Sequence, residues 1–253
     1  MTEVQEPKIL FEDGYLLIVE KPAGVLSVPD RYNPLLHNLK DSFDKKYGKI
    51  FIVHRLDKET AGVMVFAKDA DTHKNLNDQF QNFKVTKIYH SLWSGIVSKD
   101  EMLIDIPLMS DPAKKGKTIP SARGKESYSK IKVIERFRIA TLVEIELLTG
   151  RHHQIRAHAA AVGHPLLVDE MYGGGKAFYL SDIKKKYNIR KEKEERPLIS
   201  RITLHSYSLT VLHPISGEDI TCTTEYPKDF DVTLKKLKKY SVLPEYYVGS
   251  TEL

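Results

Sequence analysis

One carboxylate, Asp57, is predicted to lie at the tip of a charged loop that runs from His54 to Gly62. The stretches on either side, 51–53 and 62–67, are β-branched or aromatic and predict strands, whereas the run between them has neither strand alternation nor a helical period. Catalytic groups often lie on loops carried by a rigid sheet, so Asp57 is a candidate nucleophile. The alternative is a solvated turn in which Arg55 and Asp57 pair with each other.

The order of residues in this loop resembles the signature of the RluA family of pseudouridine synthases, His-Arg-Leu-Asp-x-x-Thr-Ser-Gly. Residues 54–62 match it with one change, since Ala61 takes the place of the usual Ser, and both side chains are small. The resemblance implies that Asp57 is the nucleophile. It also implies that other residues of the loop contact the substrate, namely His54, Arg55 and Thr60.

A second landmark is a tyrosine on a predicted strand. Residues 87–95 alternate, which places Tyr89 and Trp93 on one face and His90 on the other. A tyrosine in a strand is usually an ordinary β-former. However, Lys-x-Tyr followed by a short strand and Gly resembles the family's second motif, whose tyrosine lies against the target base. The resemblance therefore gives Tyr89 a stacking role; a role as base stays open, because a phenol with a pKa of about 10 is a weak base at neutral pH.

The most specific match is the run from 149 to 158, which resembles the family's Gly-Arg-x-His-Gln-Ile-Arg-x-His motif. It is followed by the expected Gly-His-Pro and by an Asp and a Tyr-Gly pair. Gly150 is predicted at a strand-to-helix turn, so that the early helix points toward the open end of the sheet. The resemblance assigns Arg156 to keep Asp57 ionised. Three neighbours are expected to bind substrate, namely Arg151, His153 and Gln154.

Four histidines in this region raise the alternative of a metal site. Helical ligand pairs need a spacing of three or four residues, but Arg156 stands four residues after His152 and Ala157 four residues after His153. We therefore expect no metal. We also expect no cofactor, because pseudouridine formation breaks the bond from C1′ to N1, turns the uracil and rejoins it through C5 without redox change.

The charge of the chain permits an anionic partner without requiring one, because 39 basic residues face 34 acidic ones and the net charge is +5. A locally basic stretch runs from Lys184 to Arg201. Its alternatives are an RNA-gripping element and a mobile, solvated loop. We expect the first and assign phosphate contacts to Lys184, Lys185 and Lys186.

The pattern predicts an α+β protein with the pseudouridine-synthase fold, a mixed, largely antiparallel bent sheet with flanking helices and loops around a central RNA-binding cleft. Strands are expected at 8–11 and 15–20 and as a pair at 126–137 and 138–148. Helices are expected at 33–47, closed by Gly48, at 69–83, capped by Asp69 with Phe83 on its buried face, and at 231–240.

We expect one catalytic domain over 1–253, with a family-like core at 8–230, a basic insertion at about 174–201 and a basic C-terminal helix and tail at 231–253. The core begins almost at once, which leaves no room for the N-terminal RNA-binding module that such families often carry. One cysteine, no signal sequence and no apolar run near ~18 residues indicate a cytoplasmic protein without a membrane span. We expect it to be a monomer.

The expected function is isomerisation of specific uridines in structured RNA, either ribosomal RNA, with the large subunit favoured, or a transfer RNA stem-loop. The target uridine would flip out of its stack to reach Asp57, which attacks either C1′ or the base. Two alternatives remain, a non-catalytic RNA-binding module and a metal-free glycoside or ester hydrolase. Glycoside hydrolysis needs a second carboxylate, for which Glu59 is the nearest candidate.

Overall fold

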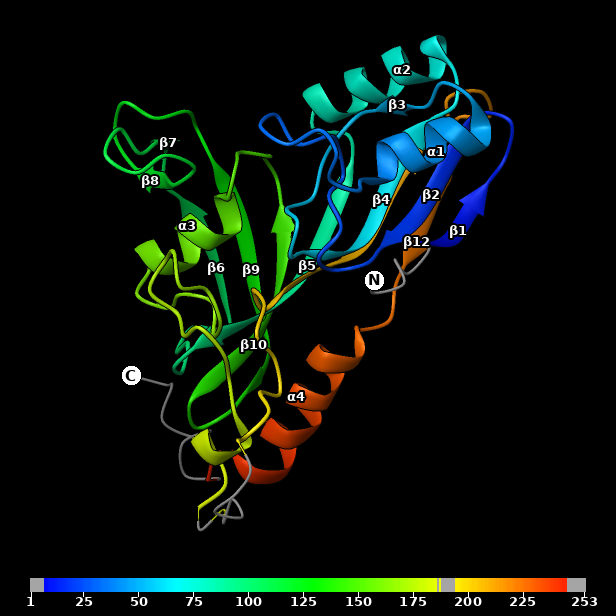
Figure 1. Ribbon diagram of the computed structural model, residues 1–253. Helices are drawn as coiled ribbons and strands as arrows, with labels where there is room; N and C mark the ends of the chain where they lie inside the picture. Colours follow the sequence, from blue (N-terminus) through cyan, green and yellow to red (C-terminus); the bar gives the residue numbers. More distant parts are fainter. Residues whose placement is uncertain (1–6, 186, 188–193, 245–253) are drawn as a thin grey trace. The chain divides into compact units, whose positions relative to one another are not determined.

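The computed structural model describes residues 7–185, 187 and 194–244 (Figure 1). The chain forms two compact units, and neither is continuous in sequence. The first unit comprises 1–89 and 205–225, and the second comprises 90–204 and 226–253. The expected single domain stays a prediction. Lys186 lies outside the described residues, as does 188–193 of the basic stretch.

The first unit is built on a mixed sheet. β2 pairs antiparallel with both β1 and β4, and β3 also pairs antiparallel with β4, whereas β11 pairs parallel with β4 and antiparallel with β12. The bounds are β1 Lys8–Glu12, β2 Leu16–Lys21, β3 Phe51–Ile52, β4 Ala61–Ala67, β11 Leu204–Leu212 and β12 Asp219–Thr223. The two strands expected at 8–11 and 15–20 are thus present.

Two helices cover the first unit's sheet (Figure 1), and both differ in length from the expected ones. α1 spans Leu39–Tyr47 and begins six residues later than the predicted start at Asn33. Its start is set by Asn38, whose side chain accepts from the Asp41 N–H, while the Leu39 N–H bonds to the Leu26 carbonyl. Leu35, expected on a buried face, is 94% exposed.

α2 spans Ala70–Gln81, and Asp69 is its N-cap as expected, since its carboxylate accepts from the Thr72 N–H at 2.8 Å. The predicted end at Phe83 is wrong. Phe83 has φ 56° and is 62% exposed, because the backbone turns out of the helix just before it.

The second unit carries an antiparallel series in which β10 pairs with β9 and β9 with β6. The predicted pair at 126–137 and 138–148 is β9 and β10. Strand β5 lies beside β10, and its first residues belong to the first unit. The bounds are β5 Thr86–Ser94, β6 Glu101–Asp105, β9 Tyr128–Arg136 and β10 Ala140–Leu147, with a separate hairpin of β7 Leu108–Ser110 and β8 Thr118–Pro120.

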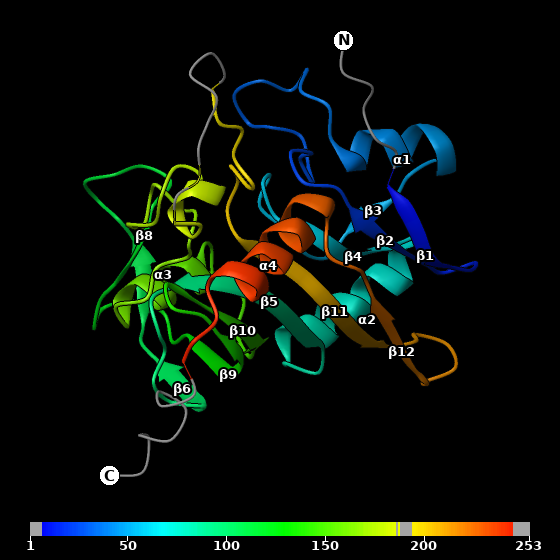
Figure 2. The same ribbon diagram turned by 90° about the horizontal axis from the view of Figure 1, so that it is seen from below.

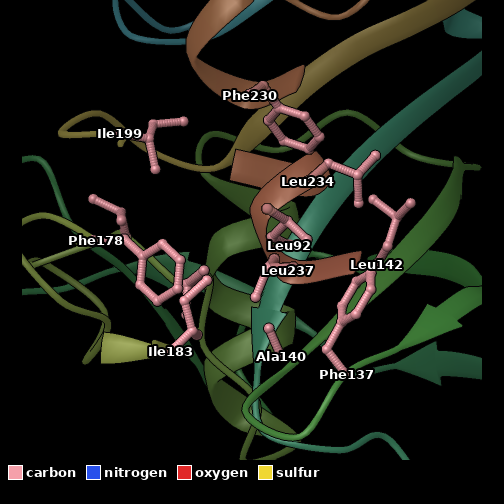
Figure 3. Packing of buried hydrophobic residues seen from close by; sticks show 12 residues of the cluster. Leu92, Phe137, Ala140, Leu142, Phe178, Ile183, Ile199, Phe230, Leu234 and Leu237 are labelled. Carbon is pink, nitrogen blue, oxygen red and sulfur yellow. The ribbon is translucent and has the colours of Figure 1, made fainter. Parts of the chain in front are cut away.

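α4, Lys228–Tyr240, lies across β5 and β10 (Figure 2) and covers the core of the second unit. Phe230, Leu234 and Leu237 of this helix are buried against Leu92 of β5 and Leu142 of β10 (Figure 3). Full burial of such a side chain stabilises a fold by about 1.5–3 kcal/mol. The helix expected at 231–240 is therefore present and begins three residues earlier.

The same core also holds the start of the basic insertion. Phe178 and Ile183 pack into it on either side of the 3₁₀ turn Leu180–Asp182. α3, the remaining helix of this unit, spans Gln154–Ala161.

A close approach of two strands fixes the position of Gly62 in the first unit. Gly62 pairs with Ser206 of β11, and its φ is +122°. A Cβ atom at this position would lie 2.0 Å from the Ser206 carbonyl oxygen. Only glycine therefore allows β4 and β11 to pair at this register.

Gly62→Ala should lower the free energy of unfolding by about 2–4 kcal/mol, because it adds both strain and a backbone clash. Gly14→Ala is the matched control, since a Cβ there meets nothing within 4 Å. Urea denaturation of the two variants gives the comparison. Equal midpoints would show that β11 can shift away from β4 without loss.

Candidate active site

The backbone on either side of Asp57 is tied to the loop that follows β2. The Ser27 hydroxyl donates to the Leu56 carbonyl at 2.9 Å and accepts from the Leu56 N–H at 3.1 Å. On the other side, the Gly24 N–H donates to the Lys58 carbonyl at 2.8 Å. Asp57 itself is half-buried. The loop thus presents this carboxylate from a backbone held at both neighbours.

Lys21, a buried residue of the first unit, also holds the backbone next to Asp57. Its side chain has 0% exposure, and its ammonium donates to the carbonyls of Pro22, Val25 and Lys58 at 3.0, 2.6 and 3.0 Å. Hydrogen bonds from a charged donor are stronger than neutral ones. Sequence analysis missed Lys21, because a lysine at the end of a strand ordinarily faces solvent.

Tyr89, also in the first unit, is within reach of the charge of Asp57. Burial raises the pKa of Tyr89 to about 12; a hydrogen bond with Ser206 opposes the shift and the Asp57 carboxylate adds to it. The ring is 7% exposed. The phenol therefore stays protonated at neutral pH, which favours the stacking role over the role as base.

His54 and Thr60, at the two ends of the charged loop, are turned into the protein. The His54 ring stacks on Phe80 at 4.9 Å, and its Nε2 accepts from the Val65 N–H at 3.1 Å. Burial, and then the charge of Lys87, lowers the pKa of His54 to about 3, so the ring is neutral. Thr60 is 2% exposed, and its hydroxyl has no hydrogen-bond partner among the described residues.

Arg55 of the same loop is exposed. Its side chain is thus placed to meet a large substrate. Contacts of His54, Arg55 and Thr60 with the substrate remain predictions.

Arg156, in the second unit, has its guanidinium held by an acid that sequence analysis did not pair with it. Its Nε and Nη2 donate to the two carboxylate oxygens of Asp169 at 2.6 and 2.8 Å, and its Nη1 donates to Nε2 of His153 at 2.8 Å. The Tyr172 ring lies 4.9 Å from the guanidinium carbon. The Asp169 side chain is 0% exposed. This bidentate pair fixes the plane of the guanidinium.

His153 supports the same group from a left-handed backbone, with φ 52°. Because its Nε2 accepts from Arg156, the ring proton is assigned to Nδ1, which donates to the Tyr172 hydroxyl at 3.0 Å. The ring also stacks on His152 at 3.8 Å. Both ring nitrogens of His153 are therefore bonded within the unit, and its expected contact with substrate stays a prediction.

Gln154 shapes the turn into α3. Its Oε1 accepts from the Thr149 hydroxyl and the Arg151 N–H at 2.8 and 3.0 Å, and its Nε2 donates to the Tyr128 carbonyl and the Ser129 hydroxyl at 3.0 and 3.1 Å. The side chain is 2% exposed. We derive a positioning role for Gln154. Arg151 is half-buried and exposes more of its side chain to a ligand.

No group of three or more His, Cys, Asp or Glu side chains in the described part of the chain is arranged to hold a metal. The histidines around α3 bond to protein groups instead. His158 contacts the Ser129 hydroxyl and the Ile106 carbonyl, and His164 contacts the Ser94 carbonyl.

Of the basic stretch, Lys185 is exposed, whereas Lys184 is half-buried with its ammonium 5.5 Å from the ring centre of Tyr240 in α4. The first unit thus brings Asp57, Tyr89 and His54 together. The second brings together Arg156, His153 and the acid that sequence analysis left unassigned, Asp169. Asp169 is the Asp that follows the Gly-His-Pro run of the family motif. The motif could therefore have suggested Asp169 as the partner of Arg156.

Comparisons with known proteins identify the family of this chain. A family model described as RNA pseudouridylate synthase matches residues 15–161. An uncharacterized RNA pseudouridine synthase of Aquifex aeolicus is 37% identical over 92% of this chain and 73% of that protein. Ribosomal large subunit pseudouridine synthase D of Pseudomonas aeruginosa is 32% identical over 92% of this chain and 72% of that protein.

Human RNA pseudouridylate synthase domain containing 4 shares the fold, with a TM-score of 0.68 at 22% identity over 91% of this chain and 93% of that one. The resemblance found in the sequence and the predicted α+β fold are both confirmed. The chain belongs to the RNA pseudouridylate synthase family and is an RNA pseudouridine synthase, an isomerase.

Proposed function

We propose that this enzyme converts specific uridines of structured RNA to pseudouridine with Asp57 as the nucleophile. The observation that carries the proposal is the placement of Asp57, a half-buried carboxylate on a loop held by Lys21 and Ser27, whose charge acts on the buried and protonated Tyr89. Binding groups fixed before the substrate arrives need little reorganisation during the reaction.

In the proposed reaction the uridine flips out of its stack, and the Asp57 carboxylate adds either to C1′ or to the base. The bond from C1′ to N1 breaks, a bond from C1′ to C5 forms, and the carboxylate is released. The C5 proton leaves to water while N1 gains one, so atoms and electrons balance without a cofactor. The Tyr89 ring supplies a stacking surface for the flipped base, which offsets part of the unstacking cost of a few kcal/mol.

We assign Arg156 to Asp57 as its counter-ion, the role that the family motif implies. Asp169 and His153 hold the plane of the guanidinium, so its charge keeps a fixed direction. An adjacent cation favours the ionised form that a nucleophile needs.

As substrate we propose large-subunit ribosomal RNA first and a transfer RNA stem-loop second. The first choice rests on relatives named for the ribosomal large subunit, such as the Pseudomonas aeruginosa protein. The enzyme is proposed to act as a monomer in the cytoplasm, where its single cysteine, the buried Cys222, stays reduced. None of the helices described is long and apolar enough to cross a membrane.

We propose further that the stretch 184–201 grips the RNA. Lys185 is its exposed cation next to the core, and Lys184 is set in place by the Tyr240 ring. A cation–π contact leaves ammonium hydrogens available to a phosphate. The third lysine of the proposal, Lys186, lies outside the described residues.

Asp57→Asn should abolish turnover and preserve RNA binding, because it removes the nucleophile and keeps the shape of the side chain. Release of tritium from C5-labelled uridine in ribosomal RNA measures isomerisation, and excess EDTA should not change the parent rate. Glu59→Gln is the control, since it neutralises another acid of the same loop. More than a trace of single-turnover product from the Asn variant would reject the assignment.

Arg156→Lys should slow the single-turnover rate about 100-fold, because the charge stays but the planar fork is lost. RNA affinity should change little. Arg136→Lys is the control, since the guanidinium of Arg136 donates to the Val97 carbonyl and the Asp100 carboxylate at 2.7 and 2.6 Å and lies outside the basic stretch. It should lose some stability and keep the rate. A normal rate with weakened binding in Arg156→Lys would make Arg156 a phosphate contact.

Replacing Lys184, Lys185 and Lys186 by Ala should weaken RNA binding and reduce the slope of log K against log salt by about 2–3 units. The saturating single-turnover rate should stay near that of the parent. A control with the same change of charge replaces Lys235, Lys238 and Lys239, which are exposed on α4. If both triple variants bind alike, the effect belongs to net charge and not to the basic stretch.

A further inference from the structure

Lys87 is a buried cation that neither the fold nor the proposed chemistry has used. It stands on β5 two residues before Tyr89, so both side chains leave the strand on the same side. Its exposure is 9%. A lysine is rarely buried to this degree unless it is paired.

In the described part of the chain, Lys87 makes no ion pair and its ammonium makes no hydrogen bond. Its Nζ is also absent from the fully enclosed polar atoms that lack a partner, so the tip of the side chain touches solvent. Lys21, the other buried lysine of this unit, differs in having its ammonium bonded to three carbonyls. The aliphatic part of Lys87 is therefore buried, and its ammonium is accessible to solvent or to a ligand.

No group of opposite charge in the described part of the chain offsets the cost of burying Lys87. Burial lowers the pKa of Lys87 to about 8, and its charge in turn acts on His54, which is neutral. Tyr89, on the same side of the strand, is neutral as well, with a pKa of about 12. The Asp57 carboxylate raises the pKa of Tyr89, whereas the lowered pKa of Lys87 comes from burial. The ammonium is thus better suited to an external anion than to Asp57.

We propose that Lys87 binds a phosphodiester group of the RNA backbone next to the flipped uridine. The site rests on the proposed function, because its ligand is the substrate. It follows from three placements within the first unit: Lys87 adjoins Tyr89 on β5, its charge acts on His54, and His54 precedes Asp57 in the same loop. A phosphate held here would fix the flipped nucleotide from its backbone while Tyr89 contacts its base.

The test compares Lys87→Met, Lys87→Arg and the control Lys74→Met, which removes an exposed cation from α2. Lys87→Met should weaken RNA binding about 10-fold and reduce the salt slope by about 0.7–0.9, as expected for one phosphate contact. The saturating single-turnover rate should stay within about twofold of the parent. Lys87→Arg should restore affinity, and Lys74→Met should cost less than Lys87→Met.

A pH series adds a readout that a merely structural lysine would not give. A phosphate favours the charged ammonium, so binding is strongest below the pKa of the free protein and should weaken as pH rises above about 8. His54 and Tyr89 do not titrate between about pH 8 and 10. The RNA affinity of Lys87→Met and of Lys87→Arg should not fall in this way above about pH 8. Protonation changes of the RNA itself affect all three proteins equally.

Two results would overturn the proposal. One is unchanged affinity and salt slope in Lys87→Met with a flat pH series in the parent. The other is normal affinity with a collapsed single-turnover rate, which would make Lys87 a partner of the reaction itself. Thermal melting shows whether Lys87→Met is misfolded. If it is, the RNA affinity of Lys87→Arg is compared with that of the parent protein across the pH series, and this comparison tests the proposal. If the parent protein released no tritium, the proposed function would be wrong. The affinities and salt slopes would still show whether Lys87 contacts an RNA phosphate, so the two failures can be distinguished.

Discussion

The fold around Asp57 depends on one buried ammonium. Lys21 has no exposure, and its three hydrogen bonds join the end of β2, the turn after it and the backbone next to Asp57. A charge in such a place is tolerated only because carbonyl dipoles replace its water. The same bonds tie the loop that carries Asp57 to the end of β2.

Some charged side chains in this protein bond to groups inside it, and others face solvent. Lys21 and the Asp169–Arg156 pair are satisfied within their own units and hold backbone or side chains in place. Arg55 and Lys87, by contrast, present their charged ends to solvent. Breaking a satisfied buried pair would cost stability, whereas removing an outward charge would alter affinity.

Local patterns predicted most strands and the Asp69 cap, because alternation and capping are short-range properties. The start of α1 was missed because its first N–H groups bond to Leu26 and Ser27, which precede it by more than a turn. The partner of Arg156 was missed for a similar reason: a long-range pair leaves no periodic signal. The family motifs located Asp57, Tyr89 and Arg156, but could not show that Gln154 and His153 bond inward.

The parallel pairing of β4 with β11 also bears on how the enzyme is made in the cell. Residues 90–204 separate the two parts of the first unit, so the ribosome must synthesise all of 90–204 before β11 can pair with β4. Until then Tyr89 lacks Ser206, and the sheet that carries the Asp57 loop has an open edge at Ala61 and Gly62 of β4. Contacts so distant in sequence form late. A nascent chain would therefore expose the unpaired backbone of these two residues until β11 is made.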